Sequence, residues 1–192
     1  MKKIVTLIGS VVLLGLLSGC GNDFKCDNKN YAEQALNLLL FENAKGGEDK
    51  YITLKSLGFE VGEITLMELD KDKKSSICKA KISNTHLKTA FEKIQQARSG
   101  KDITKGLDKE AQERMNAFAA ATNDFGAPLV MEELYQSIKG DRKQDEILST
   151  PQDFITLYGI AKVAVKLFEN GLAYRTFDNG NGDLMIEANF AE

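Results

Sequence analysis

Hydrophobic residues recur at different spacings along the chain, and each spacing indicates the element that the segment forms. Between residues 30 and 43 they recur about every three or four positions, which predicts an amphipathic helix. Asn30 and Glu33 have the spacing of an N-terminal capping box, and Gly46-Gly47 is expected to end the segment. The apolar face is broad, so we expect other structure to surround this helix; its residues are Tyr31, Ala35, Leu36, Leu38, Leu39, Leu40 and Phe41.

Residues 59–69 and 76–84 have the pattern of a β-hairpin. Its first strand contains the apolar residues Val61, Ile64, Leu66 and Leu69. In its second strand, Cys78, Ala80 and Ile82 alternate with other residues, so we place these three side chains on the core face. The charged run 70–74 between the strands predicts a solvated turn.

Residues 86–170 are predicted to be mostly helical. Helical spacing is expected over residues 87–97, about 107–123, 128–140 and 151–170, with a polar segment at 141–149. Gly100 is expected to end the first of these helices, Pro151 to begin the last, and Gly171 to close it.

Residues 172–177 and 184–190 flank a turn rich in Asp, Asn and Gly, which predicts a second hairpin. The element order therefore predicts an α+β fold: an antiparallel sheet of about four strands, made from two hairpins and packed on helices. The helices of about residues 86–150 would be an insertion between the hairpins. A calcium loop at the turn is not expected, since Leu184 and Phe190 would occupy the positions where an EF-hand needs Gly and Glu.

Composition narrows the function classes. A chain of 192 residues suggests one domain, and its formal net charge of −3 argues against nucleic acid as the main partner. A single histidine makes a His-rich metal site implausible. Phosphate-binding loops and nucleophile-elbow motifs are missing from the sequence, so we expect no catalytic residues, no metal and no cofactor.

The N-terminus has the composition of a secretory signal. Lys2 and Lys3 precede an apolar stretch at residues 4–17, which is too short to span a bilayer as a helix. The sequence Leu17-Ser18-Gly19-Cys20 that follows resembles the lipobox of bacterial lipoproteins. The alternative is an ordinary secretory signal in which Cys20 enters a disulfide.

The lipobox resemblance implies that residues 1–19 are a cleaved signal peptide and that residues 20–192 form a single lipoprotein domain. Cys20 would carry the acyl chains, and two or three chains suffice for stable anchoring. The resemblance also implies a location in the cell envelope. Gly21, where an Asp would favour the inner membrane, favours the outer membrane, facing the periplasm or the cell surface.

Cys26 and Cys78 remain after Cys20 is assigned. In an oxidising compartment they are expected to form a disulfide, which would close a loop of about 53 residues and contribute about 4 kcal/mol by chain entropy. The alternative is a cysteine nucleophile served by His86. The sequence around Cys78 is typical of a strand, and His86 is typical of an exposed residue at a helix entry.

A second, weaker resemblance covers about 90 residues. The helix preceded by Cys26, the strand Cys78-Lys79-Ala80 and the strand Ala173-Tyr174-Arg175 are similar to small uncharacterised bacterial lipoproteins. In those proteins a disulfide joins the start of the helix to a Cys-x-Ala strand.

The leading functional hypothesis is a non-catalytic envelope lipoprotein that binds, inhibits or helps assemble another envelope protein. One alternative is a carrier of an apolar ligand, which would need a sizeable apolar cavity. Another is a lipid-anchored hydrolase of a cell-wall polymer, which would need two carboxylates brought together by the fold. The adjacent pairs Glu132/Glu133 and Asp145/Glu146 do not make such a site by themselves.

Overall fold

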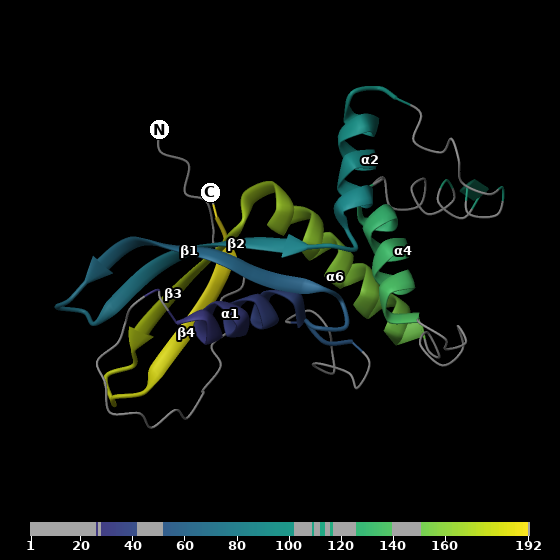
Figure 1. The fold of residues 1–192 in the computed structure, drawn as a ribbon. Helices are drawn as coiled ribbons and strands as arrows, with labels where there is room; N and C mark the ends of the chain where they lie inside the picture. The colour runs from purple at the N-terminus through teal and green to yellow at the C-terminus, as the bar shows by residue number, and fades with distance from the viewer. Residues whose placement is uncertain are drawn as a thin grey trace, which may run out of the picture.

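The structure is a computed structural model that describes residues 26, 28–41, 52–101, 109, 112, 113, 116, 126–139 and 151–191. Its elements in chain order are α1 (Lys29–Phe41), β1 (Phe59–Asp70), β2 (Ser75–Asn84), α2 (Lys88–Arg98), α4 (Gly126–Lys139), α6 (Pro151–Asn170), β3 (Leu172–Asp178) and β4 (Leu184–Phe190) (Figure 1). This order confirms the predicted α+β fold class. The expected signal peptide, Gly46-Gly47, the segment 141–149 and most of the helix expected at 107–123 lie outside the described residues.

The four strands form one antiparallel sheet in the order β1-β2-β3-β4. Each predicted hairpin is present, and the two are joined where β2 pairs with β3. At that junction Cys78 lies opposite Tyr174, and Ala80 lies opposite Leu172. Both members of these pairs are buried, so the centre of the sheet forms part of the core, as the alternation in β2 predicted.

Strand β1 contains two irregularities in its pairing with β2. The register shifts between Val61 and Ile64, and again between Leu66 and Glu68. Each shift inserts one extra residue into β1, so the next apolar side chain returns to the core side of the sheet. As a result Leu66 lies opposite Cys78 and Leu69 lies opposite Ser76.

Helix α1 packs on the sheet with the broad apolar face that its sequence predicted. Ala32, Ala35, Leu36, Leu39, Leu40 and Phe41 are buried. The start of the helix differs from the prediction. The backbone N–H of Asn30 donates to the side-chain oxygen of Asn28 at 3.0 Å, so Asn28 rather than Asn30 is the capping residue. The capping box of Asn30 and Glu33 is therefore wrong.

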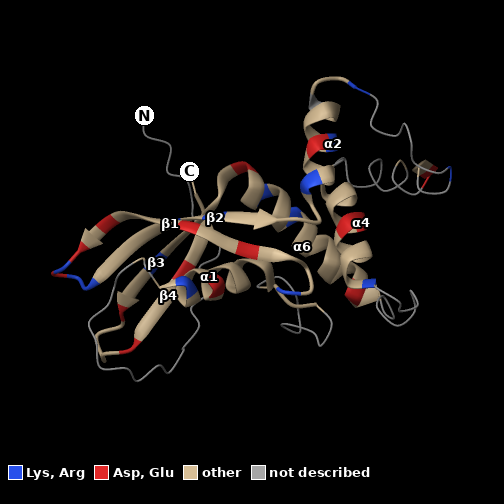
Figure 2. Ribbon diagram, viewed as in Figure 1, with Lys and Arg blue, Asp and Glu red and all other residues tan. Residues whose placement is uncertain are grey.

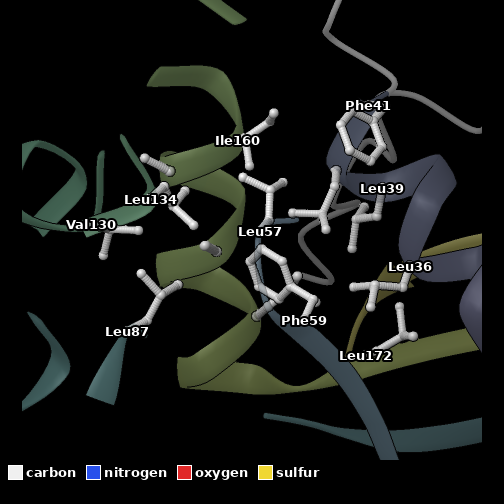
Figure 3. Packing of buried hydrophobic residues seen from close by; sticks show 14 of the residues in the cluster. Leu36, Leu39, Phe41, Leu57, Phe59, Leu87, Val130, Leu134, Ile160 and Leu172 are labelled. Carbon is white, nitrogen blue, oxygen red and sulfur yellow. The ribbon is translucent and has the colours of Figure 1, made fainter. Parts of the chain in front are cut away.

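Helices α2 and α4 lie beyond the end of the sheet where β1 begins and β2 ends, and α6 runs from beside α4 back to the sheet (Figure 1). Helix α6 packs against α4, and its Phe168 stacks on Phe91 of α2 with ring centroids 3.8 Å apart. Gly171, at φ +87°, ends α6 and directs the chain into β3, as predicted. Figure 3 shows Leu57 and Phe59 between α1 and α6, where they join the two parts of the core.

Candidate interaction surface

The Cys26–Cys78 disulfide is formed. The two Cα atoms are 5.6 Å apart, and Cys78 is fully buried in the sheet. The hydroxyl of Tyr174 donates to the carbonyl of Cys26 at 3.4 Å, which ties the same point to β3. Because both thiols are oxidised to the disulfide, the alternative of a cysteine nucleophile at Cys26 or Cys78 is wrong. Cys20 lies outside the described residues.

His86 is exposed, at the turn that leads from β2 into α2. Its backbone N–H donates to the side-chain oxygen of Asn84 at 2.9 Å. The amide nitrogen of the same Asn84 side chain donates to the carbonyl of Leu57 at 2.8 Å. His86 therefore has the exposed helix-entry position that its sequence context predicted, and buried Asn84 joins the end of β2 to the segment before β1.

The turn between β3 and β4 is held by hydrogen bonds between its own backbone N–H groups and the side chain of Asp178. The carboxylate of Asp178 accepts hydrogen bonds from the backbone N–H groups of Gly180 and Gly182 at 2.7 and 3.1 Å. It also forms an ion pair with Lys74 at 3.2 Å. These hydrogen bonds, those from Gly180 and Gly182 first, lower the pKa of Asp178. In the part of the chain that the structure describes, three or more His, Cys, Asp or Glu side chains nowhere gather as they would around a metal ion.

Three described carboxyl groups, those of Glu63, Asp70 and Asp178, have a displaced pKa, and in each the pKa is lowered. The hydrogen bond from Lys81, at 2.7 Å, lowers the pKa of Glu63, and the backbone hydrogen bond from Lys73 lowers that of Asp70. A glycosidase acid needs the opposite shift, a raised pKa. Among the described carboxyl groups, no displaced pKa is a raised one, so none of these shifts supports the hydrolase alternative.

The outer edge of β1 is the most distinctive surface feature. Strand β1 is at one edge of the sheet, and no described strand pairs with its outer side. It carries the acidic residues Glu60, Glu63, Glu68 and Asp70 and has no Lys or Arg (Figure 2). An unpaired edge strand presents backbone N–H and C=O groups that can pair with another chain, and its charges decide which chains can approach.

A groove of about 230 Å³ lies beside the first half of β1. Helix α1 forms one wall, and the segment leading into β1 forms the other; the lining residues are Glu33, Leu36, Leu54, Lys55, Gly58, Phe59, Glu60 and Val61. The lining combines apolar side chains such as Leu36 and Leu54 with charged ones such as Glu33 and Lys55. This volume is below the usual range for pockets that enclose a small molecule, so the groove does not favour the apolar-carrier alternative.

The second half of β1 exposes large apolar side chains between its acidic residues. Five large hydrophobic side chains of the described residues are exposed, and four of them lie on the β1–β2 hairpin: Leu66, Met67, Leu69 and Ile77. The fifth, Ile155, lies on α6. The alternation of β1 predicts that Leu66 and Leu69 lie in a strand but does not distinguish them from core residues. The irregular spacing of apolar residues in β1 is the feature of the sequence that sets this strand apart from a regular core strand.

Comparisons with known proteins identified no related family, and neither the curated proteins nor the solved structures contain a match. Within the described ranges, none of the helices combines the length and the apolar character that crossing a membrane requires.

Proposed function

We propose that the protein is a lipid-anchored envelope protein without catalytic activity, which binds another envelope protein through the outer edge of β1. The lipobox-like sequence that ends in Cys20 supports the anchor. The acidic outer edge of β1, with which no described strand pairs, is bordered by the groove against α1, and this edge is the observation that carries the binding role.

The chemistry of this edge favours an extended, basic segment as the bound part of the partner. A strand added beside β1 would pair with its outward-facing backbone groups and place alternate side chains over the groove. Glu60, in the half of β1 beside the groove, has no ion-pair partner among the described residues, so its carboxylate is available to a Lys or Arg side chain of the partner. Two copies of β1 would oppose acid to acid, which disfavours pairing of the protein with itself.

Site-specific crosslinking in cells tests the binding role. A photo-crosslinking residue at Glu60 is expected to capture one defined envelope protein, whereas the same residue at exposed Gln95 on α2 is not. In the Glu60 crosslinking variant, the further change Glu63→Lys should weaken capture, because it places a positive charge in the same half of β1, and Glu92→Lys on α2 is the matched control. Equal capture from both positions would contradict the proposed surface.

The anchor has a separate test. Cys20→Ser should leave an uncleaved precursor that incorporates no fatty acid, because only a thiol can form the thioether. Mass spectrometry of the membrane fraction measures both the cleavage and the acyl chains. A Cys20→Ser protein that matures like the wild type would exclude the lipobox assignment.

A further inference from the structure

The exposed apolar side chains of the β1–β2 hairpin are concentrated in one place. Leu66, Met67 and Leu69 are 48%, 62% and 43% exposed, and Ile77 across the hairpin is 38% exposed. Single exposed apolar residues are normal on protein surfaces, but a cluster marks a contact surface. We call the turn end of the hairpin, residues 66–77, the arm. Figure 1 shows that the arm projects away from α2 and α4.

The register places apolar side chains on both faces of the arm. Leu66 and Leu69 lie opposite Cys78 and Ser76, on the core side of the sheet, where the covering layer ends. Ile77 lies opposite Glu68, and it therefore points to the other face. A surface that contacts the arm must accept apolar groups on both sides of the hairpin.

The disulfide places the arm beside the exit of the chain toward Cys20. Cys26 is bonded to Cys78, which lies directly opposite Leu66. Residues 21–25 separate Cys26 from Cys20, and five residues extend at most about 17 Å. If Cys20 is acylated, the bilayer surface therefore lies within reach of Leu66 at all times.

The charges at the tip of the arm are compatible with lipid headgroups. The turn at the tip contains Lys71, Lys73 and Lys74 together with Asp70 and Asp72, and Figure 2 shows the lysines at the far end of the hairpin. Lys73 forms an ion pair with Asp70 and Lys74 one with Asp178, both at 3.2 Å, so most of the charge at the tip is balanced and does not oppose contact with a lipid surface. Lysines that border an apolar strip can lie at the boundary between headgroups and acyl chains.

We propose that the β1–β2 arm rests on the membrane that holds the lipid anchor, with Leu66, Met67 and Leu69 in the interfacial layer. This inference rests on the acylation of Cys20 in the proposed function. The tether makes the contact intramolecular, so even a small apolar surface suffices at the resulting effective concentration. The groove half of β1 then remains available to a protein partner.

Tryptophan fluorescence tests the proposal, because the chain contains no tryptophan of its own. Met67→Trp and, as the matched control, Ile155→Trp place a single probe at exposed apolar positions on the arm and on α6. Each full-length, acylated protein is reconstituted into vesicles of phosphatidylethanolamine and phosphatidylglycerol that include lipids with brominated acyl chains. We expect a blue-shifted, strongly quenched emission from position 67 and neither change at position 155. In the Met67→Trp protein, adding Leu66→Ser and Leu69→Ser should remove most of the quenching.

The possible failures are distinguishable. A protein that carries acyl chains and sediments with the vesicles, but whose tryptophan at position 67 is not quenched, overturns the membrane contact and leaves the anchor intact. A protein without acyl chains overturns both. Shielding of position 67 that requires an added envelope protein would assign the arm to a protein interface and would also overturn the proposal.

Discussion

Among the glycines that the structure describes, Gly58 is the one at which an added Cβ meets the closest neighbour. Its φ is +75°, a conformation that costs an L-residue about 1–2 kcal/mol. A Cβ at this position would also collide with the ring of His86. The turn before β1 thus requires glycine for both its backbone and its neighbour, and that turn forms part of the groove wall.

Gly58→Ala should lower the free energy of unfolding by about 1–2 kcal/mol from the backbone alone, with a further loss from displacing His86. Gly100→Ala is the matched control, since Gly100 has a φ of +80° and open space around its Cβ position. His86→Ala in the Gly58→Ala protein should remove the difference between the two variants. Urea unfolding measures all of them, and a Gly58→Ala protein as stable as the wild type would contradict the geometry.

Asn84 is a buried side chain that uses both ends of its amide. Asn84→Asp keeps an oxygen to accept the N–H groups of His86 and Leu87 but replaces the donor to the Leu57 carbonyl. We expect a loss of about 1–3 kcal/mol, because the new oxygen faces a carbonyl without a proton to share. Ser83→Asp, at the exposed neighbouring position, is the control for added charge. Equal unfolding midpoints for the two variants would show that the Leu57 contact contributes little.

At the scale of elements, Asp178 connects the two hairpin turns. It accepts backbone N–H groups within its own turn and pairs with Lys74 from the turn of the other hairpin. The backbone hydrogen bonds, with Lys74, lower its pKa from the ordinary 3.8. A carboxyl with a lowered folded-state pKa stabilises the fold at pH values above its unfolded pKa, and this contribution disappears as the pH falls through the folded pKa.

The wild type should therefore be more stable than Asp178→Asn at pH values above about 4, and the difference should shrink as the solution is acidified below that point. The amide keeps an oxygen for the two glycine N–H groups, so the variant removes the charge without removing the acceptor. Asp72→Asn, at an exposed position in the other turn, corrects for net charge. Thermal unfolding over a pH series is the measurement, and a difference that grows on acidification would refute the sign.

The elements of this fold follow closely from local patterns. Both hairpins, the start of α6 at Pro151 and the end of α2 before Gly100 are where the sequence predicts them. These features depend on side chains only a few positions apart. The cap of α1 was misassigned to Asn30 because Asn28 and Asn30 have the same side chain, and only the backbone geometry shows which one receives the N–H.

At the scale of the whole molecule, the disulfide joins the entry of α1 to the centre of the sheet. Replacing both cysteines, Cys26→Ala with Cys78→Ala, should cost roughly 2–5 kcal/mol because the unfolded chain regains its freedom. Reduction of the wild type should produce a similar loss in urea unfolding. Thiol titration of the denatured, full-length Cys20→Ser protein should detect no free thiol before reduction and two afterwards; a free thiol before reduction would contradict the pairing.

The irregular spacing in β1 separates what a pattern can specify from what it cannot. Val61, Ile64, Leu66 and Leu69 change from steps of two to steps of three at the two register shifts, so the bulges were present in the sequence. The sequence did not show which of these side chains the bulges would leave exposed to solvent. Val61 is buried while Leu66 and Leu69 are exposed, although all are apolar and share a face.

Side-chain spacing therefore specified the strands, turns and helices, and the count of cysteines, once Cys20 was assigned to the proposed anchor, specified the disulfide. The elements depend on contacts between residues close together in the chain, and the disulfide depends on a bond that only two cysteines can form. The groove and the exposed arm depend instead on where the helical layer stops covering the sheet, which is set by contacts between residues far apart in the chain. The same apolar side chain is core under that layer and contact surface beyond it, so only the assembled fold distinguishes the two.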